Sequence, residues 1–153
     1  MPSCCKQVRE FLDFGKALHA EVRKLYSRLG DSAQLERLRM LLDYLERHEQ
    51  HMVQTLARFE HESHEGLLNS WLEYSPALDV GSVIENCRLS EQPSTEDIVA
   101  AALSFDEALV QLYQEMAEKA VDARTRALFQ DLVHLEQQEQ ISVSRAAMSL
   151  ADM

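Results

Sequence analysis

Apolar side chains recur every three or four residues along four segments of the chain, which begin near residues 5, 33, 95 and 122. This spacing places the apolar side chains on one face of an α-helix. Glycine and proline, which end or bend helices, number only four and three among the 153 residues. The sequence therefore predicts four long helices, each with one face that must be buried against the others.

The segment between the second and third predicted helices, about residues 65–94, has a different composition. It contains two of the three prolines and two of the four glycines. It also contains Trp71 and Tyr74, which we expect to pack it onto the helices or to form a dimer contact. We interpret this segment as a long crossover between a helical hairpin of about residues 5–64 and a second of about residues 95–151. The prediction is an all-α four-helix bundle that forms one domain over the whole chain.

The net charge of −11 excludes several classes of partner. Nucleic-acid phosphates and anionic membrane surfaces repel such a chain. No run approaches the ~20 apolar residues that a membrane-spanning helix requires, and the first ten residues contain no apolar core of a secretory signal. We expect a cytoplasmic protein that binds neither nucleic acid nor membrane and that forms a homodimer or docks another protein.

The sequence also repeats itself weakly at a distance of 87 residues. Leu25-Tyr26 aligns with Leu112-Tyr113, and Glu49-Gln50 aligns with Glu136-Gln137. Ten identities relate residues 10–58 to their equivalents, where ordinary composition gives roughly three or four by chance. Two amphipathic hairpins share some matches through patterning alone, but the paired matches favour a duplicated hairpin.

Extending each apolar stripe shows which ionisable residues face the core. In the predicted second and fourth helices the stripe passes through Glu49, Glu136 and Glu139. In the third predicted helix, apolar residues of the stripe lie before and after Asp106, and in the first they lie before and after His19. Thirty residues separate His19 from Glu49, and thirty also separate Asp106 from Glu136. Each helix is therefore expected to bring one such group to a similar depth.

The register of the first hairpin has two solutions. Gly30 is expected to end the first helix, whereas the midpoint between His19 and Glu49 lies at residue 34. A turn at Gly30 would shift His19 away from the level of Glu49. Glu21 is then the alternative to His19 as the inward ionisable residue of the first helix.

Carboxylates buried without counter-charge are costly, and several at one level require a cation, shared protons or basic partners. Carboxylate and imidazole donors suit iron or manganese. The predicted metal ligands are His19, Glu49, Asp106, Glu136 and Glu139. In the alternative interpretation, each helix is rotated about its axis by one residue. These groups then lie at boundaries between helices, where they need no metal.

These residues resemble the ligand pattern of the ferritin-like superfamily, closest to its short rubrerythrin-like members. That pattern gives twice a unit of an acidic residue seven before a tyrosine and, thirty residues later, E-x-x-H. The corresponding segments here are "HAEVRKLY", "HEQHM", "DEALVQLY" and "LEQQE". The resemblance covers nearly the whole chain outside the crossover. It implies a bundle of two hairpins joined by a crossover, with a metal centre of redox or metal-handling role.

The chain departs from that pattern at three positions. Met52 and Glu139 stand where the two histidines are expected, and His19 replaces the acidic residue of the first helix. A thioether is a poor ligand for ferric iron. The site is either rearranged, with His19 or His48 supplying nitrogen, or has lost its metal.

Two functions agree with these observations. The first is a ferritin-like protein whose carboxylate and histidine centre binds iron or manganese in a redox or metal-handling role. The second is a non-catalytic helical bundle without metal, which acts by dimerising or by docking a partner. Whether the chain is an enzyme stays open in both.

Overall fold

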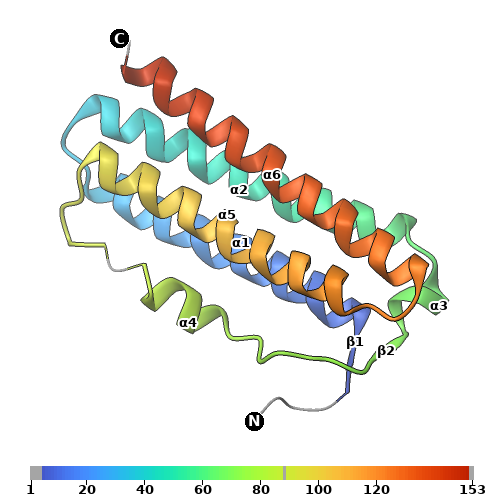
Figure 1. Ribbon diagram of the computed structural model, residues 1–153. Coiled ribbons are helices and arrows are strands. Elements are labelled where there is room, and N and C mark those ends of the chain that lie inside the picture. Colours follow the sequence, from blue (N-terminus) through green and yellow to red (C-terminus); the bar gives the residue numbers. More distant parts are fainter. Residues whose placement is uncertain (1–4, 88, 152–153) are drawn as a thin grey trace.

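The computed structural model describes residues 5–87 and 89–151, which are mostly helical (Figure 1). Its elements in chain order are β1 (Lys6–Gln7), α1 (Val8–Ser32), α2 (Glu36–Glu62), α3 (Glu65–Leu68), β2 (Trp71–Leu72), α4 (Val80–Glu85), α5 (Thr95–Lys119) and α6 (Ala123–Ala151). α1 and α2 pack along each other as one hairpin, and α5 and α6 pack as another. The predicted all-helical architecture of two hairpins is confirmed at this level.

The turn of the first hairpin lies later than the sequence predicts. α1 continues through Gly30 to Ser32, and α2 begins at Glu36. Gly30 does not have a positive φ, so it does not form the left-handed cap that ends many helices. Its carbonyl instead accepts a hydrogen bond from the N–H of Ala33, 3.3 Å away. The turn is therefore centred near residue 34, the midpoint that places His19 level with Glu49.

The second hairpin has the turn that its sequence predicts. Ser94 caps α5, because its hydroxyl accepts the N–H of Asp97 while the Asp97 carboxylate accepts the N–H of Ser94. At the other end of the hairpin, the Asp122 carboxylate accepts the N–H of Thr125 at 2.8 Å and so caps α6. Each of the two long helices therefore begins at a side-chain cap, and the cap of α6 lies at the turn between them.

The crossover packs along α1 and α5. β2 pairs with β1 in an antiparallel manner, and α4 contacts both α1 and α5. The Tyr74 hydroxyl donates to Glu115 on α5 at 2.5 Å, and the Lys119 ammonium lies 5.2 Å from the centre of the Tyr74 ring. Tyr74 therefore attaches the crossover to α5, as the sequence predicts. Trp71, in contrast, is 65% exposed.

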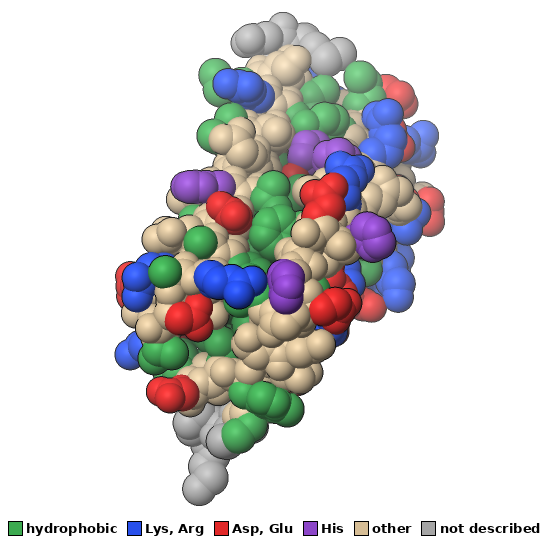
Figure 2. All heavy atoms as spheres, turned by 90° about the vertical axis from the view of Figure 1, so that its right-hand side faces the viewer, with side chains coloured by type: hydrophobic (Ala, Val, Ile, Leu, Met, Phe, Trp, Pro, Cys, Tyr) green, Lys and Arg blue, Asp and Glu red, His purple; other side chains and the backbone are tan. Residues whose placement is uncertain are grey.

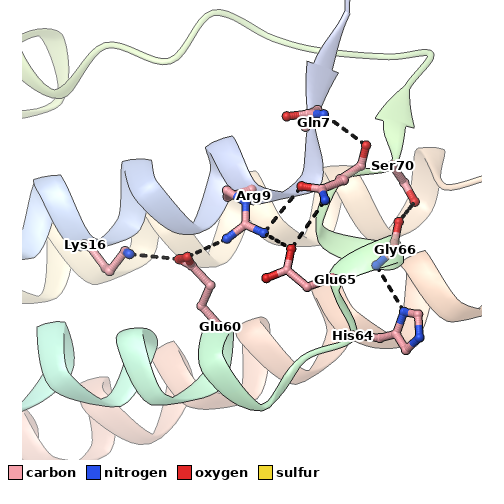
Figure 3. A network of polar contacts seen from close by, with 9 residues as sticks. Gln7, Arg9, Lys16, Glu60, His64, Glu65, Gly66 and Ser70 are labelled. Atoms are coloured by element: carbon pink, nitrogen blue, oxygen red, sulfur yellow. Dashed lines mark hydrogen bonds and ion pairs between the residues drawn. The ribbon is translucent and has the colours of Figure 1, made fainter.

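Ion pairs fix α1 against the end of α2 (Figure 3). The Arg9 guanidinium lies 2.9 Å from Glu60 and 2.7 Å from Glu65, and the Lys16 ammonium lies 2.8 Å from Glu60. The two partly buried contacts with Glu60 on α2 agree with the register that sets His19 opposite Glu49. The contact with Glu65, on α3, is exposed. The face of the molecule in Figure 2 carries acidic and basic side chains interspersed, with histidines among them, so the net negative charge does not form one uniform patch there.

The helices contain no membrane-spanning candidate among residues 5–87 and 89–151, because none is both long and apolar enough.

Gly15 leaves room on α1 for the hydroxyl of Tyr113, which extends from α5. A Cβ atom at Gly15 would lie 2.3 Å from the Tyr113 hydroxyl and 3.2 Å from Leu56. We expect Gly15→Ala to lower the free energy of unfolding by about 1 to 3 kcal/mol, because the fully buried phenol must shift. Chemical denaturation measures this change.

Two control variants isolate the steric cause. Gly30→Ala places its Cβ 3.8 Å from Leu42, an ordinary contact, so this variant should gain roughly 0.5 kcal/mol from helix propensity. Adding Tyr113→Phe to Gly15→Ala removes the clashing oxygen and should recover much of the loss. Equal destabilisation by both alanine variants would contradict the argument.

Candidate metal centre

Five ionisable side chains from the four long helices meet in the interior at one level. They are His19 on α1, Glu49 on α2, Asp106 on α5, and Glu136 and Glu139 on α6. None of these residues is more than 2% exposed. The inward stripe of each helix explains this placement, since Glu49 and Met52, or Glu136 and Glu139, are one helical turn apart on the same face.

His19 lies between two carboxylates. Its Nδ1 contacts Oε2 of Glu49, and its Nε2 lies 2.8 Å and 3.2 Å from the two oxygens of Glu136. A neutral imidazole has only one N–H to donate, so while both carboxylates are ionised, His19 donates to both as the imidazolium. His19 is therefore a buried cation that connects α1 and α2 of the first hairpin to α6 of the second.

Asp106, unlike His19, has no hydrogen-bond partner among the described residues. Its residue is 1% exposed, and neither of its oxygens has a hydrogen-bond partner among the described residues. A buried carboxylate ordinarily accepts several hydrogen bonds, because leaving its oxygens unsatisfied costs about 1 to 3 kcal/mol or more. The fold therefore buries both oxygens of Asp106 without a hydrogen-bond donor among the described residues.

Glu139 faces a second histidine at the edge of the layer. His48 Nδ1 and Glu139 Oε2 lie 2.5 Å apart as an ion pair. The side chain of His48 is 19% exposed, and that of Glu139 is 1% exposed. The rings of Tyr44 and His51 pack beside His48. His48 therefore extends the buried layer to the surface of the molecule.

The electrostatics of the layer agree with crowded negative charge. Burial raises the pKa of Asp106 well above its usual range, and the charges of Glu49 and Glu136 raise it further. Burial opposes protonation of His19, yet Glu136 and Glu49 raise its pKa well above the ordinary value. Burial also raises the pKa of Glu139 despite its contact with His48. The positive charge near the four carboxylates is therefore smaller than the negative charge that they carry when all are ionised.

Two buried tyrosines lie next to this layer, one from each half of the chain. The hydroxyls of Tyr26 and Tyr113 have no hydrogen-bond partner among the described residues. Burial raises the pKa of Tyr26, as do the charges of Glu49, Asp106 and Glu139. Burial and the charge of Glu136 raise the pKa of Tyr113. Both phenols therefore stay protonated and keep a free O–H within the interior.

The layer offers two groups of three side chains that can hold a metal ion. One group is His19, Asp106 and Glu136, and the other is Glu49, Asp106 and Glu139. Within each group the ligand atoms lie within 4.8 Å of one another, and every residue is buried. Asp106 belongs to both groups.

The structure brings together all five side chains that the sequence singles out. Glu21, the alternative to His19, instead pairs with Lys24 at 3.1 Å and has a side chain 47% exposed. His48 is the neighbour of Glu139 that the predicted set omits. The signal for His48 is its position one residue before Glu49, at the edge of the apolar stripe.

Comparison with known proteins gives no family for the chain. No family model matches it, and no curated protein matches it. Among solved structures, a hypothetical protein from Pyrococcus furiosus is similar, with 13% sequence identity and a TM-score of 0.42 over 95% of this chain and 90% of that chain.

Proposed function

We propose that the buried layer binds a transition-metal ion, iron or manganese, and that the protein is a ferritin-like four-helix bundle with a redox or metal-handling role. The observation that carries the proposal is Asp106, whose two oxygens are buried and have no partner among the described residues. A cation placed there satisfies both oxygens at once. None of the described side chains donates a hydrogen bond to either oxygen.

The charges of the layer support a cation. Four carboxylates, from Glu49, Asp106, Glu136 and Glu139, face two imidazoles, from His19 and His48. Even with both imidazoles protonated, the layer holds two uncompensated negative charges when all four acids are ionised. The ion pairs of this layer that the structure describes involve histidine only, with no lysine or arginine. One divalent ion balances the remaining charge.

The donor set fits the proposed metals. Carboxylate oxygens with one imidazole suit iron and manganese better than softer metals, which prefer thiolate or thioether ligands. Glu49, Asp106, Glu136 and Glu139 would supply oxygen, and His19 would supply nitrogen once the metal displaces its proton. An ion of this kind, when bound, supplies one-electron chemistry in an interior that excludes bulk water. The chain holds the ligands on four rigid helices and keeps the Tyr26 and Tyr113 hydroxyls available as donors beside them.

The first test is metal content. Protein stripped with chelator, loaded anaerobically with Fe(II) or Mn(II) and passed through a desalting column should retain at least one ion per chain, measured by elemental analysis. Asp106→Asn should lose most of this metal, because Asp106 belongs to both groups of ligands. Admitting air to the iron-loaded protein should produce new absorption in the near ultraviolet.

A matched variant controls for charge. Asp131 is an exposed acid on α6, so Asp131→Asn removes the same charge and should retain the metal. Less than about a tenth of an ion per chain in the wild-type protein would refute the proposal and favour a bundle that acts without metal.

The second test is the stability of the metal-free protein. In the presence of chelator, Asp106→Asn should raise the free energy of unfolding by about 1 kcal/mol or more, because it removes a buried, uncompensated charge. Residues kept for binding rather than for folding show such an increase when they are neutralised. Thermal and urea unfolding measure the change, with Asp131→Asn expected to leave it near zero. A clear loss of stability in Asp106→Asn would instead make Asp106 a structural residue.

A further inference from the structure

The single tryptophan of the chain stays outside the core. The sequence leaves Trp71 either packed onto the helices or in a dimer contact, and the structure leaves it 65% exposed on β2. We propose that Trp71 is the central contact of a homodimer, in which this end of the bundle meets the same end of a second copy. The inference does not depend on a bound metal.

The backbone of β2 directs Trp71 outward and holds it there. Successive side chains of a β-strand point to opposite sides, and Leu72, the other residue of β2, packs against the core. β1 pairs with β2, with Gln7 opposite Trp71. The N–H of Val8 also donates to the carbonyl of Ser70 at 3.1 Å. The exposed indole therefore projects from an ordered strand, which reduces the entropy lost when it binds a partner.

A second exposed apolar residue lies beside Trp71. Val121 is 75% exposed and belongs to the turn between α5 and α6. Both residues line one shallow depression of the surface, together with Ala120. Figure 1 shows β2 and this turn at the same end of the bundle. Adjoining apolar side chains on a surface mark contact sites, and tryptophan is among the residue types most enriched where binding energy concentrates.

The charges around these two residues favour a second copy as the partner. The whole chain has a net charge of −11, so two copies repel each other unless they meet through a surface without net charge. Glu73, Lys119 and Asp122 line the same depression, and Arg124 lies on the adjoining surface with Asp122. Two acids and two bases therefore balance here. Figure 2, which views the side of the molecule at the right of Figure 1, shows acidic and basic side chains interspersed.

The same surface is complementary to itself. In a two-fold symmetric contact, residue i of one copy faces residue j of the other, and the reverse contact also forms. Glu73 follows Trp71 by two residues, and Lys119 precedes Val121 by two. Packing Trp71 of one copy on Val121 of the second therefore brings Glu73 of the first toward Lys119 of the second. The symmetry doubles both the apolar and the ionic contact.

The size of the apolar centre predicts a dimer that dissociates on dilution. An aromatic side chain buries about 150–250 Å², whereas a stable interface buries about 1,200–2,000 Å² in total. Two copies of Trp71 and Val121 supply only the centre of such an interface, and the charged residues supply its rim.

The fluorescence of Trp71 reports directly on this contact, because no other tryptophan contributes to it. Sedimentation velocity of the full-length protein, with a reducing agent present, should show monomers converting to dimers as the protein concentration rises. The emission maximum should shift to shorter wavelength over the same concentration range, since the indole leaves water as the dimer forms.

Three alanine variants locate the surface. Trp71→Ala should raise the dissociation constant by about thirtyfold or more, and Val121→Ala should raise it by about tenfold. Met148→Ala is the matched control, because Met148 is 68% exposed near the far end of α6. It should leave the dissociation constant unchanged. Circular dichroism confirms that each variant is folded.

A charge exchange tests the symmetric arrangement. Lys119→Glu and Glu73→Lys should each raise the dissociation constant by about tenfold, because each brings like charges together across the interface. The double variant restores the opposite charges and should recover most of the affinity. Thermal unfolding of the monomer controls for Lys119, whose ammonium also lies 5.2 Å from the centre of the Tyr74 ring.

Several outcomes would overturn this inference. A monomer at every concentration would do so. A dimer whose tryptophan emission does not change on dilution, or whose dissociation constant is the same in Trp71→Ala as in Met148→Ala, would mean that the copies meet through another surface. Further weakening in the double charge variant, without recovery, would exclude the two-fold contact of Glu73 with Lys119.

Discussion

The contact of His19 with Glu49 and Glu136 is the interaction on which the interior depends. It joins α1 to α2 within the first hairpin and to α6 of the second through a single imidazole ring. Removing one partner of such a buried ionic contact leaves an unpaired charge, which costs about 3 to 5 kcal/mol. The apolar side chains around it pack in many arrangements, but this contact is satisfied only when both hairpins have the observed register and depth.

That contact also leaves an uneven distribution of charge in the layer. Apolar replacements of similar volume would stabilise a core of this size as well or better, so four carboxylates at one level are not what folding alone requires. The protein satisfies Glu49 and Glu136 internally with His19 and leaves both oxygens of Asp106 without a donor among the described residues. Paired and unpaired carboxylates thus occur in one layer, and the acid without a hydrogen-bond donor is the one common to both groups of possible ligands.

Helical periodicity alone was enough to predict the two hairpins and the inward direction of Glu49, Asp106, Glu136 and Glu139, because a buried stripe fixes which residues share a face. It could not fix the first turn. Gly30 has the residue type of a helix end, but α1 continues past it, and Ala33 forms the cap. Periodicity also cannot give contacts across the core, so the pairing of His48 with Glu139 and the two hydrogen bonds of His19 required the packing of all four helices.

Under the proposed function, the differences between this chain and the ferritin-like pattern that it resembles amount to an exchange of groups across this layer. Relative to that pattern, a carboxylate is replaced by His19 on α1, and a histidine is replaced by Glu139 on α6. Met52 stands in place of the other histidine, and His48, about one turn earlier on α2, reaches the layer from its edge. The layer therefore still contains four carboxylates and two imidazoles. The two imidazoles lie within contact distance of the acids, since His19 contacts Glu49 and Glu136, and His48 contacts Glu139. This balance of charge, together with the unpartnered oxygens of Asp106, is the physical basis of the metal site that we propose.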